Sequence, residues 1–301
     1  MKKTKNKFIL LFNPQPEKSK RTVMPLGLLA ISTLLDKDGY NIKICHSSQK
    51  KEDEVILEKI DNAICVGISS MTGYQITDGL RFAQLVRDRN KNIPIVWGGV
   101  HPTIETKQTI QHSLVDIIVR GQGEETFYEL VKVLEAKADL KNVKGIVYKV
   151  KGAVMTNIAR PIKDMNEFPP IPYHLLDKSV GRYIKKTVYS ERTLPIITSS
   201  GCPFRCGFCY LSTPEYQRKW DGYPSERIIK EVEFLIDKYK VDTIDIRDSN
   251  FFISKERVRQ FFSSIIEKEI KILFINLNGR VDQLINCDDD LWRLMERAGV
   301  K

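Results

Sequence analysis

The sequence predicts an α/β protein of two parts, a doubly wound parallel sheet followed by a shorter series of β/α units. Short apolar runs alternate with stretches whose apolar residues recur at helical spacing, and this alternation is typical of a parallel sheet. A proline-dense segment at 159–190 interrupts the pattern, because proline lacks an amide donor and fits neither a core strand nor a helix interior. We therefore expect domains at 1–158 and 191–301, joined by a stiff linker.

The first part is predicted to contain five parallel strands and four helices. Each strand is a short run rich in Ile, Val, Leu or Phe, and the runs lie at 7–12, 41–45, 64–68, 94–97 and 116–119. Helical spacing of apolar residues predicts helices at 25–38, 51–60, 76–90 and 124–136. Two further runs, at 144–148 and 154–158, predict a hairpin that turns at Lys151-Gly152.

Polar and glycine-containing loops follow these strands. Open α/β sheets bind ligands at the carboxyl ends of their strands, where glycine permits close backbone approach and free amides receive polar groups. Asn13-Pro14-Gln15-Pro16 follows the first strand. The loops after the third, fourth and fifth strands contain the candidate ligand-binding residues, which are Ser69, Ser70, Thr72, Gly98, Gly99, His101, Gly121, Gly123 and Glu124. Together the loops predict a ligand crevice.

The second part is predicted to contain three β/α units. Strands are expected at 192–198, 243–248 and 272–278, with helices at 226–239, from about 255 to 268, and at 288–298. Ser225 and Ser254 are expected to cap the first two helices. Polar residues, including Asp248, Asn250 and Arg280, follow the second and third strands, where sites in such barrels lie.

Three of the six cysteines fall within eight residues, at positions 202, 206 and 209. Three thiolates are one short of the four that usually hold an iron–sulfur cluster or a structural zinc ion. The spacing therefore predicts a cluster with one iron open to another ligand; buried or zinc-bound thiols are the alternative. Cys45, Cys65 and Cys287 are scattered, and this usage fits a reducing compartment with a metal site.

The segment C-x3-C-x-aromatic-C after a strand, with Phe208 at the aromatic position, resembles the signature of the radical S-adenosylmethionine (SAM) superfamily. The resemblance implies that Cys202, Cys206 and Cys209 ligate a 4Fe–4S cluster and that SAM binds the fourth iron. It implies a partial (β/α)6 TIM-like barrel, of which this chain holds the first half. The residues implied to bind SAM are Phe208, Asp248, Asn250 and Arg280. Alternatively, Asp248 and Asn250 only form a turn before the Ser254 cap.

The segments GG-x-H-P-T at 98–103 and G-x-G-E-E at 121–125 resemble loops of cobalamin-binding domains fused to radical SAM domains. The similarity is closest to the family of the anaerobic magnesium-protoporphyrin IX monomethyl ester cyclase and the cobalamin-dependent methylases. It implies that the crevice loops of the first part bind cobalamin. The motif D-x-H-x-x-G is absent, so the resemblance implies cobalt without a protein histidine ligand; His101 as axial ligand is the alternative.

By this resemblance the protein is an enzyme in which the cluster cleaves SAM to a 5′-deoxyadenosyl radical. Methylation of an unactivated carbon in a small-molecule, lipid or tetrapyrrole substrate is the first expectation. The alternatives are a radical cyclase or rearrangement enzyme, and a truncated, non-catalytic module that binds cobalamin or a cluster. The family implies an external one-electron reductant of the flavodoxin or ferredoxin type. Because only three β/α units are present, we expect a fragment of a longer protein or a truncated product.

The formal net charge of +10 does not by itself indicate a nucleic-acid partner. The lysines are dispersed and interleaved with acidic residues, and no nucleic-acid-binding motif is recognisable, so we expect a solvated basic surface. No run approaches the ~18–20 apolar residues of a membrane helix, and the basic start lacks a signal-peptide core. We therefore expect a cytoplasmic protein without a transmembrane segment.

Overall fold

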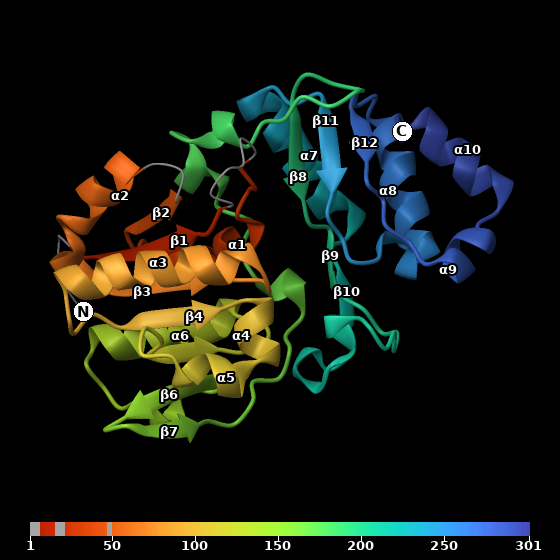
Figure 1. Ribbon diagram of the computed structural model, residues 1–301. Coiled ribbons are helices and arrows are strands. Elements are labelled where there is room, and N and C mark those ends of the chain that lie inside the picture. The colour runs from red at the N-terminus through yellow and green to blue at the C-terminus, as the bar shows by residue number, and fades with distance from the viewer. Residues whose placement is uncertain (1–6, 16–21, 47–49) are drawn as a thin grey trace. The chain divides into compact units, whose positions relative to one another are not determined.

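The computed structural model describes residues 7–15, 22–46 and 50–301, which form two compact units (Figure 1). The first unit comprises the chain up to Lys163 together with Phe168–Asp177 and Thr213–Tyr216. The second comprises Asp164–Glu167, Lys178–Ser212 and Gln217–Lys301. Pieces of the proline-dense segment thus belong to both units. The boundaries expected at 158 and 190 stay a prediction about where independent domains begin and end.

A sheet with the order β2-β1-β3-β4-β5-β6-β7 forms the middle of the first unit. Its strands are β1 (Phe8–Asn13), β2 (Ile42–His46), β3 (Ala63–Ser69), β4 (Ile95–Gly98), β5 (Ile117–Val119), β6 (Ile146–Val150) and β7 (Ala153–Thr156). The first five pair in parallel, whereas β6 and β7 are antiparallel. The strand order reverses between β1 and β3, which is the switch point of a doubly wound sheet. The predicted parallel sheet and the predicted hairpin are both confirmed.

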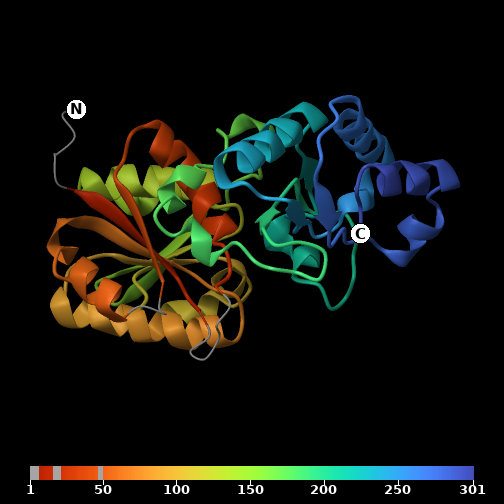
Figure 2. The same cartoon turned by 90° about the horizontal axis from the view of Figure 1, so that it is seen from above.

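Helices cover both faces of this sheet (Figure 2). One face packs against α1 (Leu26–Lys37) and α6 (Glu124–Glu135), and the other packs against α2 (Lys50–Leu57) and α3 (Tyr74–Arg89). Strand β1 contributes to both cores, because successive side chains of a strand point to opposite faces. Phe12 faces α3 and stacks on Phe82 at 3.9 Å between ring centroids, whereas Leu11 belongs to the core on the other side.

Two short helices were not predicted, α4 (Val100–Ile104) and α5 (Thr106–Gln111). The sequence GG-x-H-P-T predicts a loop, because helices of five and six residues are too short for helical periodicity to be recognised. Ile110 of α5 is buried in the same core as α3. The residues after β4 therefore form a compact helical turn at the carboxyl edge of the sheet.

The second unit contains a parallel sheet with the order β12-β11-β8. Its strands are β8 (Thr193–Ile196), β11 (Thr243–Ile246) and β12 (Leu273–Ile275), and its helices are α7 (Ser225–Tyr239), α8 (Lys255–Glu267), α9 (Val281–Ile285) and α10 (Asp289–Arg297). Buried aromatic rings fill the space between this sheet and α8. The ring centroid of Phe262 lies 5.5 Å from that of Phe274 and 6.0 Å from that of Phe251. These β/α units confirm the predicted fold class of the second part.

The predicted helix caps differ in outcome. The Ser254 hydroxyl accepts a hydrogen bond from the Arg257 amide at 3.2 Å, so the cap of α8 is confirmed. The prediction for Ser225 is wrong, because the helix begins one residue earlier than expected. Pro224, in an extended conformation, occupies the N-cap position, and Ser225 is already the first helical residue. No helix of the described chain is long and apolar enough to cross a membrane.

A two-stranded antiparallel ribbon was not predicted. It consists of β9 (Ser199–Gly201) and β10 (Trp220–Gly222), which pair Ser199 with Gly222 and Gly201 with Trp220. The apolar strand expected to run to residue 198 ends at Ile196, where the chain leaves the parallel sheet and enters the ribbon. Short 3₁₀ turns connect the elements, at Ile60–Asn62, Leu140–Asn142, Met165–Glu167, Tyr173–Leu176, Val180–Arg182, Tyr210–Ser212, Pro214–Tyr216 and Phe251–Ile253.

Candidate functional site

The ribbon brings together the two ends of the segment 202–219, and the three clustered cysteines lie in the first part of this segment. Gly201 is the last residue of β9 and immediately precedes Cys202. Its φ is +77°, and a Cβ atom at this position would lie 1.9 Å from the Lys219 carbonyl oxygen. Only glycine adopts this conformation without strain and without a clash against backbone. Glycine is therefore required at position 201, where the chain enters the cysteine loop (residues 202–209).

Inside the cysteine loop the backbone folds into a tight turn. The Cys209 amide donates to the Cys206 carbonyl at 3.0 Å, and the Ser212 hydroxyl lies 3.1 Å from the Cys206 carbonyl and 2.7 Å from that of Cys209. The three thiols of the loop are free and partly exposed. No three His, Cys, Asp or Glu side chains of the described residues converge as they would on one metal ion. In a 4Fe–4S cluster each cysteine binds a different iron, so the three thiols need not converge on one point. Ligation of a cluster by these three thiols stays a prediction.

Arg280 places a positive charge against one of these thiols. Its Nη1 donates to Cys206 Sγ at 3.0 Å, and its guanidinium lies 4.0 Å from the centroid of the Phe204 ring. Asp282 accepts from Nε and Nη2 of the same guanidinium, each at 3.0 Å, and this contact lowers the pKa of Asp282. A positively charged hydrogen-bond donor beside Sγ suits the negative charge of a cluster that cysteines ligate. The donor set of the loop therefore fits an iron–sulfur cluster.

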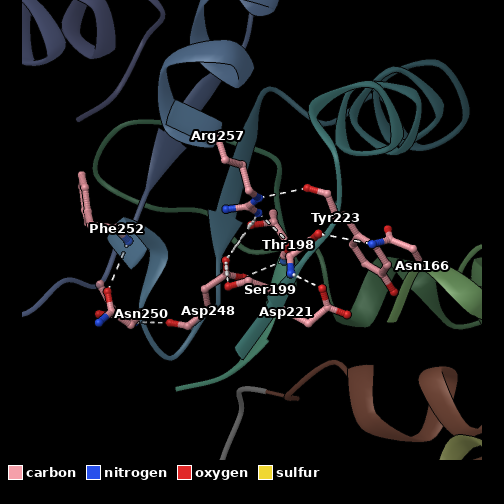
Figure 3. Close-up of polar contacts among 11 residues, drawn as sticks. Asn166, Thr198, Ser199, Asp221, Tyr223, Asp248, Asn250, Phe252 and Arg257 are labelled. Carbon is pink, nitrogen blue, oxygen red and sulfur yellow. Dashed lines mark hydrogen bonds and ion pairs between the residues drawn. The ribbon is translucent and has the colours of Figure 1, made fainter. Parts of the chain in front are cut away.

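The residues expected to bind SAM have different environments. Phe208 is 95% exposed, and Arg280 is also accessible. Asp248 is fully buried, and both of its carboxylate oxygens accept hydrogen bonds from Thr198 and Ser199 (Figure 3). Asn250 is also buried: its amide oxygen accepts from the Phe252 amide at 3.2 Å, and its nitrogen donates to Gln283 at 2.6 Å. A contact between SAM and any of these four residues remains a prediction.

Thiol chemistry separates the cysteine loop from the other cysteines. Cys45, Cys65 and Cys287 are buried, and burial raises the pKa of Cys65 to about 12 and raises that of Cys287. Because the thiolate is the reactive form, a raised pKa slows alkylation below that pKa. We expect iodoacetamide at about pH 8 to modify the three loop thiols of apo protein first, with Cys65 slower by roughly a hundredfold or more. Peptide mass mapping over time measures this; all six cysteines should react in urea, and early labelling of Cys65 would contradict the structure.

In the first unit, the loops after β3 and β4 are hydrogen-bonded to each other. The Ser70 amide donates to the Gly98 carbonyl at 2.9 Å, and the His101 amide donates to the Ser70 carbonyl at 3.0 Å. Gly99, with φ of +94°, approaches this pair so closely that a Cβ atom would lie 2.9 Å from Ser69 Oγ and from Ser70 O. The Ser70 hydroxyl is buried and has no hydrogen-bond partner in the described part of the chain. An orphaned hydroxyl beside a glycine cradle fits a bound polar ligand.

The loop after β5 joins the same edge. The Thr103 hydroxyl donates to the Gly99 carbonyl at 2.7 Å and accepts from the Gly121 amide at 3.1 Å. Thr72 Oγ1 and His101 Nδ1 lie 3.1 Å apart on the exposed side of the loops. The structure therefore brings together the predicted residues of the first unit that follow β3, β4 and β5.

The start of α6 completes this edge. A Cβ atom at Gly123 would lie 2.9 Å from Ile31 Cγ2, so the loop packs closely against α1. The next residue, Glu124, begins α6 and is half-buried. Loss of solvent around its carboxyl group raises the pKa of that group.

Sequence reasoning missed a cluster of buried polar residues at the ends of β1 and β2. Asn13 Nδ2 lies 3.3 Å from His46 Nδ1 and 2.9 Å from the Val23 carbonyl oxygen. Gln15 is also buried, and its backbone amide donates to Asp78 Oδ2 at 2.8 Å. The loop after the first strand was the available signal for Asn13 and Gln15, whereas His46 lies 33 positions from Asn13 and nothing in the sequence joins them.

Two family models match this chain. A B12 binding domain matches residues 17–131, and the radical SAM superfamily matches residues 196–301. The first match contains the crevice loops after β3, β4 and β5, and the second contains the cysteine loop. The chain is a cobalamin-binding radical SAM protein.

Curated relatives match most of this radical SAM protein. It is 31% identical to an uncharacterized methyltransferase of Pyrococcus horikoshii over 264 residues, which cover 83% of this chain and 55% of the relative. It is 28% identical to the anaerobic magnesium-protoporphyrin IX monomethyl ester cyclase of Synechocystis sp., over 94% of this chain and 56% of that enzyme. The chain thus spans about half the length of these two relatives.

Solved structures share the fold of this chain. The cobalamin-dependent SAM radical enzyme OxsB, solved with aqua-cobalamin and SAM, superposes with a TM-score of 0.80 at 19% identity, over 99% of this chain and 43% of OxsB. TsrM of Kitasatospora setae, solved with cobalamin and a 4Fe–4S cluster, gives a TM-score of 0.76 at 13% identity, over 98% of this chain and 58% of TsrM. At these identities the likeness concerns the fold.

Proposed function

We propose that this chain is part of an enzyme that methylates an unactivated carbon of a small-molecule, lipid or tetrapyrrole substrate, using cobalamin, SAM and a 4Fe–4S cluster. The observation that carries the proposal is the loop of three free, partly exposed thiols in the radical SAM unit of a chain that also has a B12-binding unit. Methyltransferases among the relatives support methyl transfer as the reaction. Since the chain spans about half of its first relatives, the proposal concerns the whole protein.

The residues of the radical SAM unit would act as ligands and as charge partners. Cys202, Cys206 and Cys209 would hold the cluster, and Arg280 would keep a positive charge beside Cys206. A cluster with SAM supplies one-electron cleavage of SAM to a 5′-deoxyadenosyl radical, and cobalamin supplies a methyl carrier. Hydrogen bonds and charges near cluster sulfurs affect the reduction potential, so Arg280 is placed to influence it.

In the B12-binding unit the loops after β3, β4 and β5 would hold cobalamin. The buried Ser70 hydroxyl and the backbone around Gly99 offer polar contacts to the periphery of a corrin. The contact between Thr72 and His101 fixes the imidazole through Nδ1. We further propose that a flavodoxin or ferredoxin supplies the electron. We also propose that the protein works in the reducing cytoplasm, since the described cysteines form no disulfide.

Product analysis tests the proposal. The 301-residue chain is reconstituted anaerobically with iron, sulfide and hydroxocobalamin, and is then given SAM and dithionite. We expect 5′-deoxyadenosine together with S-adenosylhomocysteine, because methyl donation to cobalamin releases the latter. A Cys209→Ala variant serves as the background. Absence of 5′-deoxyadenosine above that background would overturn the proposed function.

A radical cyclase is the second candidate, because the Synechocystis cyclase matches 94% of this chain. The same experiment separates the two reactions. A cyclase should give 5′-deoxyadenosine without cobalamin-dependent S-adenosylhomocysteine. A non-catalytic module should give neither product while still retaining iron or cobalamin.

A further inference from the structure

Strand β9 is attached to the core of the radical SAM unit by a buried polar network. Between the end of β8 and the start of β9, Thr198 has no strand partner for its amide. That amide donates instead to Asp248 Oδ1 at 2.6 Å, and the hydroxyls of Thr198 and Ser199 both donate to Asp248 Oδ2 at 2.6 Å (Figure 3). Asp248 is 0% exposed. Three donors from two consecutive residues thus converge on one carboxylate at the end of β11.

Arg257 of α8 joins the two strands of the ribbon. Its Nε donates to the Tyr223 carbonyl at 2.9 Å, and its Nη2 donates to the Thr198 carbonyl at 2.7 Å and to the Thr198 hydroxyl. Thr198 immediately precedes β9 and Tyr223 immediately follows β10. The two residues are also bonded directly, because the Tyr223 amide donates to the Thr198 carbonyl at 2.9 Å. One guanidinium therefore holds both strands at the end of the ribbon opposite the cysteine loop.

The charges of this network balance each other in the interior. Arg257 Nη2 lies 4.0 Å from Asp248 Oδ2, and the Arg257 side chain is 9% exposed. The guanidinium also lies 5.5 Å from the centroid of the Phe251 ring and 6.0 Å from that of Trp220. Its Nη1 has no hydrogen-bond partner among the residues that the structure describes. A buried ion pair tolerates the loss of either partner poorly, since an uncompensated charge would remain.

We propose that Asp248 and Arg257 are positioning residues that fix the ribbon β9–β10 and, through it, the geometry of the cysteine loop. We call Thr198, Ser199, Tyr223, Asp248 and Arg257 the ribbon clamp. Asp248 acts here through Thr198 and Ser199, because these two residues donate three hydrogen bonds to its carboxylate and the side chain is buried. Gly201 connects the ribbon to the loop, because it pairs with Trp220 in the ribbon and immediately precedes Cys202. The role in cluster binding rests on the proposed function; the role in fixing the ribbon does not.

Amide hydrogen exchange of the apo protein tests the clamp itself. Arg257→Lys keeps the positive charge but loses the two guanidinium nitrogens that donate to Thr198 and Tyr223. Asp248→Asn replaces an acceptor oxygen by an NH₂ group, which cannot accept from Thr198 and Ser199. We expect both variants to exchange the amides of 199–201 and 220–222 about tenfold faster or more than wild type, because opening now requires fewer broken bonds. Arg259→Lys is the matched control: Arg259 lies on the same helix, is partly exposed and pairs with Asp288. Folded variants with wild-type exchange would overturn the clamp.

Iron release tests the consequence for the cluster. Residues that orient metal ligands change metal affinity by about 10- to 100-fold, so we expect reconstituted Arg257→Lys protein to lose iron to a chelator at least about tenfold faster than Arg259→Lys. Fast ribbon exchange with unchanged iron release would overturn the link to the loop. If a charge change prevents folding, Thr198→Val removes only a hydroxyl and is expected to give the same effects in weaker form. Wild-type protein that binds no iron would refute the proposed function, and hydrogen exchange would still decide on the clamp.

Discussion

Replacing Cys206 by alanine should reduce the iron content of the reconstituted protein from about four atoms per chain to less than one. Cys206 is one of three thiols available to the cluster, and two protein ligands do not hold a 4Fe–4S core firmly. Its thiol is also the one that Arg280 contacts at 3.0 Å. The substitution should leave the apo protein folded, because the backbone groups of Cys206 make the turn with Cys209 and Ser212.

The measurement is iron and sulfide per chain after anaerobic reconstitution, with the visible absorbance of the cluster as a second readout. Cys287→Ala is the matched control, because Cys287 is buried and lies outside the cysteine loop. Its thiol donates a hydrogen bond to the Gln283 carbonyl of its own segment. Circular dichroism of both apo variants should match that of wild type. Iron content of Cys206→Ala equal to that of Cys287→Ala would refute ligation by the loop.

The sequence was sufficient to predict the elements that have a clear apolar run or a clear helical repeat of apolar residues. Strand β1 is a continuous apolar run and helix α3 repeats apolar residues at helical spacing, and their positions in the structure differ from expectation by only one or two residues. The cysteine loop could be recognised for a different reason: its meaning lies in the identity and spacing of residues close together in the chain. Local information of both kinds survives folding, because it does not depend on distant partners.

The ribbon clamp could not be predicted, because its contacts are long-range. Asp248 meets Thr198 from 50 positions away, and Arg257 meets it from 59. Strands β9 and β10 have three residues each, which is too short for alternation to be visible. The sequence therefore predicts that Asp248 either binds SAM or forms a local turn, and neither interpretation includes a buried carboxylate that bonds to Thr198 and Ser199.

Alanine at Gly99 should weaken cobalamin binding by about tenfold or more and destabilise the B12-binding unit by about 1–3 kcal/mol. Gly99 has a φ of +94°, which side chains rarely adopt, and a Cβ atom would approach Ser70 N to 3.0 Å as well as Ser70 O to 2.9 Å. These backbone atoms cannot withdraw freely, because Ser70 is bonded to Gly98 and to His101. Relief of the clash must therefore separate the loops after β3 and β4, which are the loops expected to contact cobalamin.

Gly152→Ala separates this steric effect from backbone strain. Gly152 turns the β6–β7 hairpin with a φ of +85°, and no atom of the described chain lies within 4 Å of a Cβ atom placed there. This variant should lose only the roughly 1–2 kcal/mol of a left-handed alanine and should bind cobalamin as wild type does. Urea unfolding measures the stabilities, and absorbance titration with hydroxocobalamin measures the affinities. Equal affinity of Gly99→Ala and Gly152→Ala would show that cobalamin binds away from the loops after β3 and β4, whereas a selective loss at Gly99 assigns the site to this edge of the sheet.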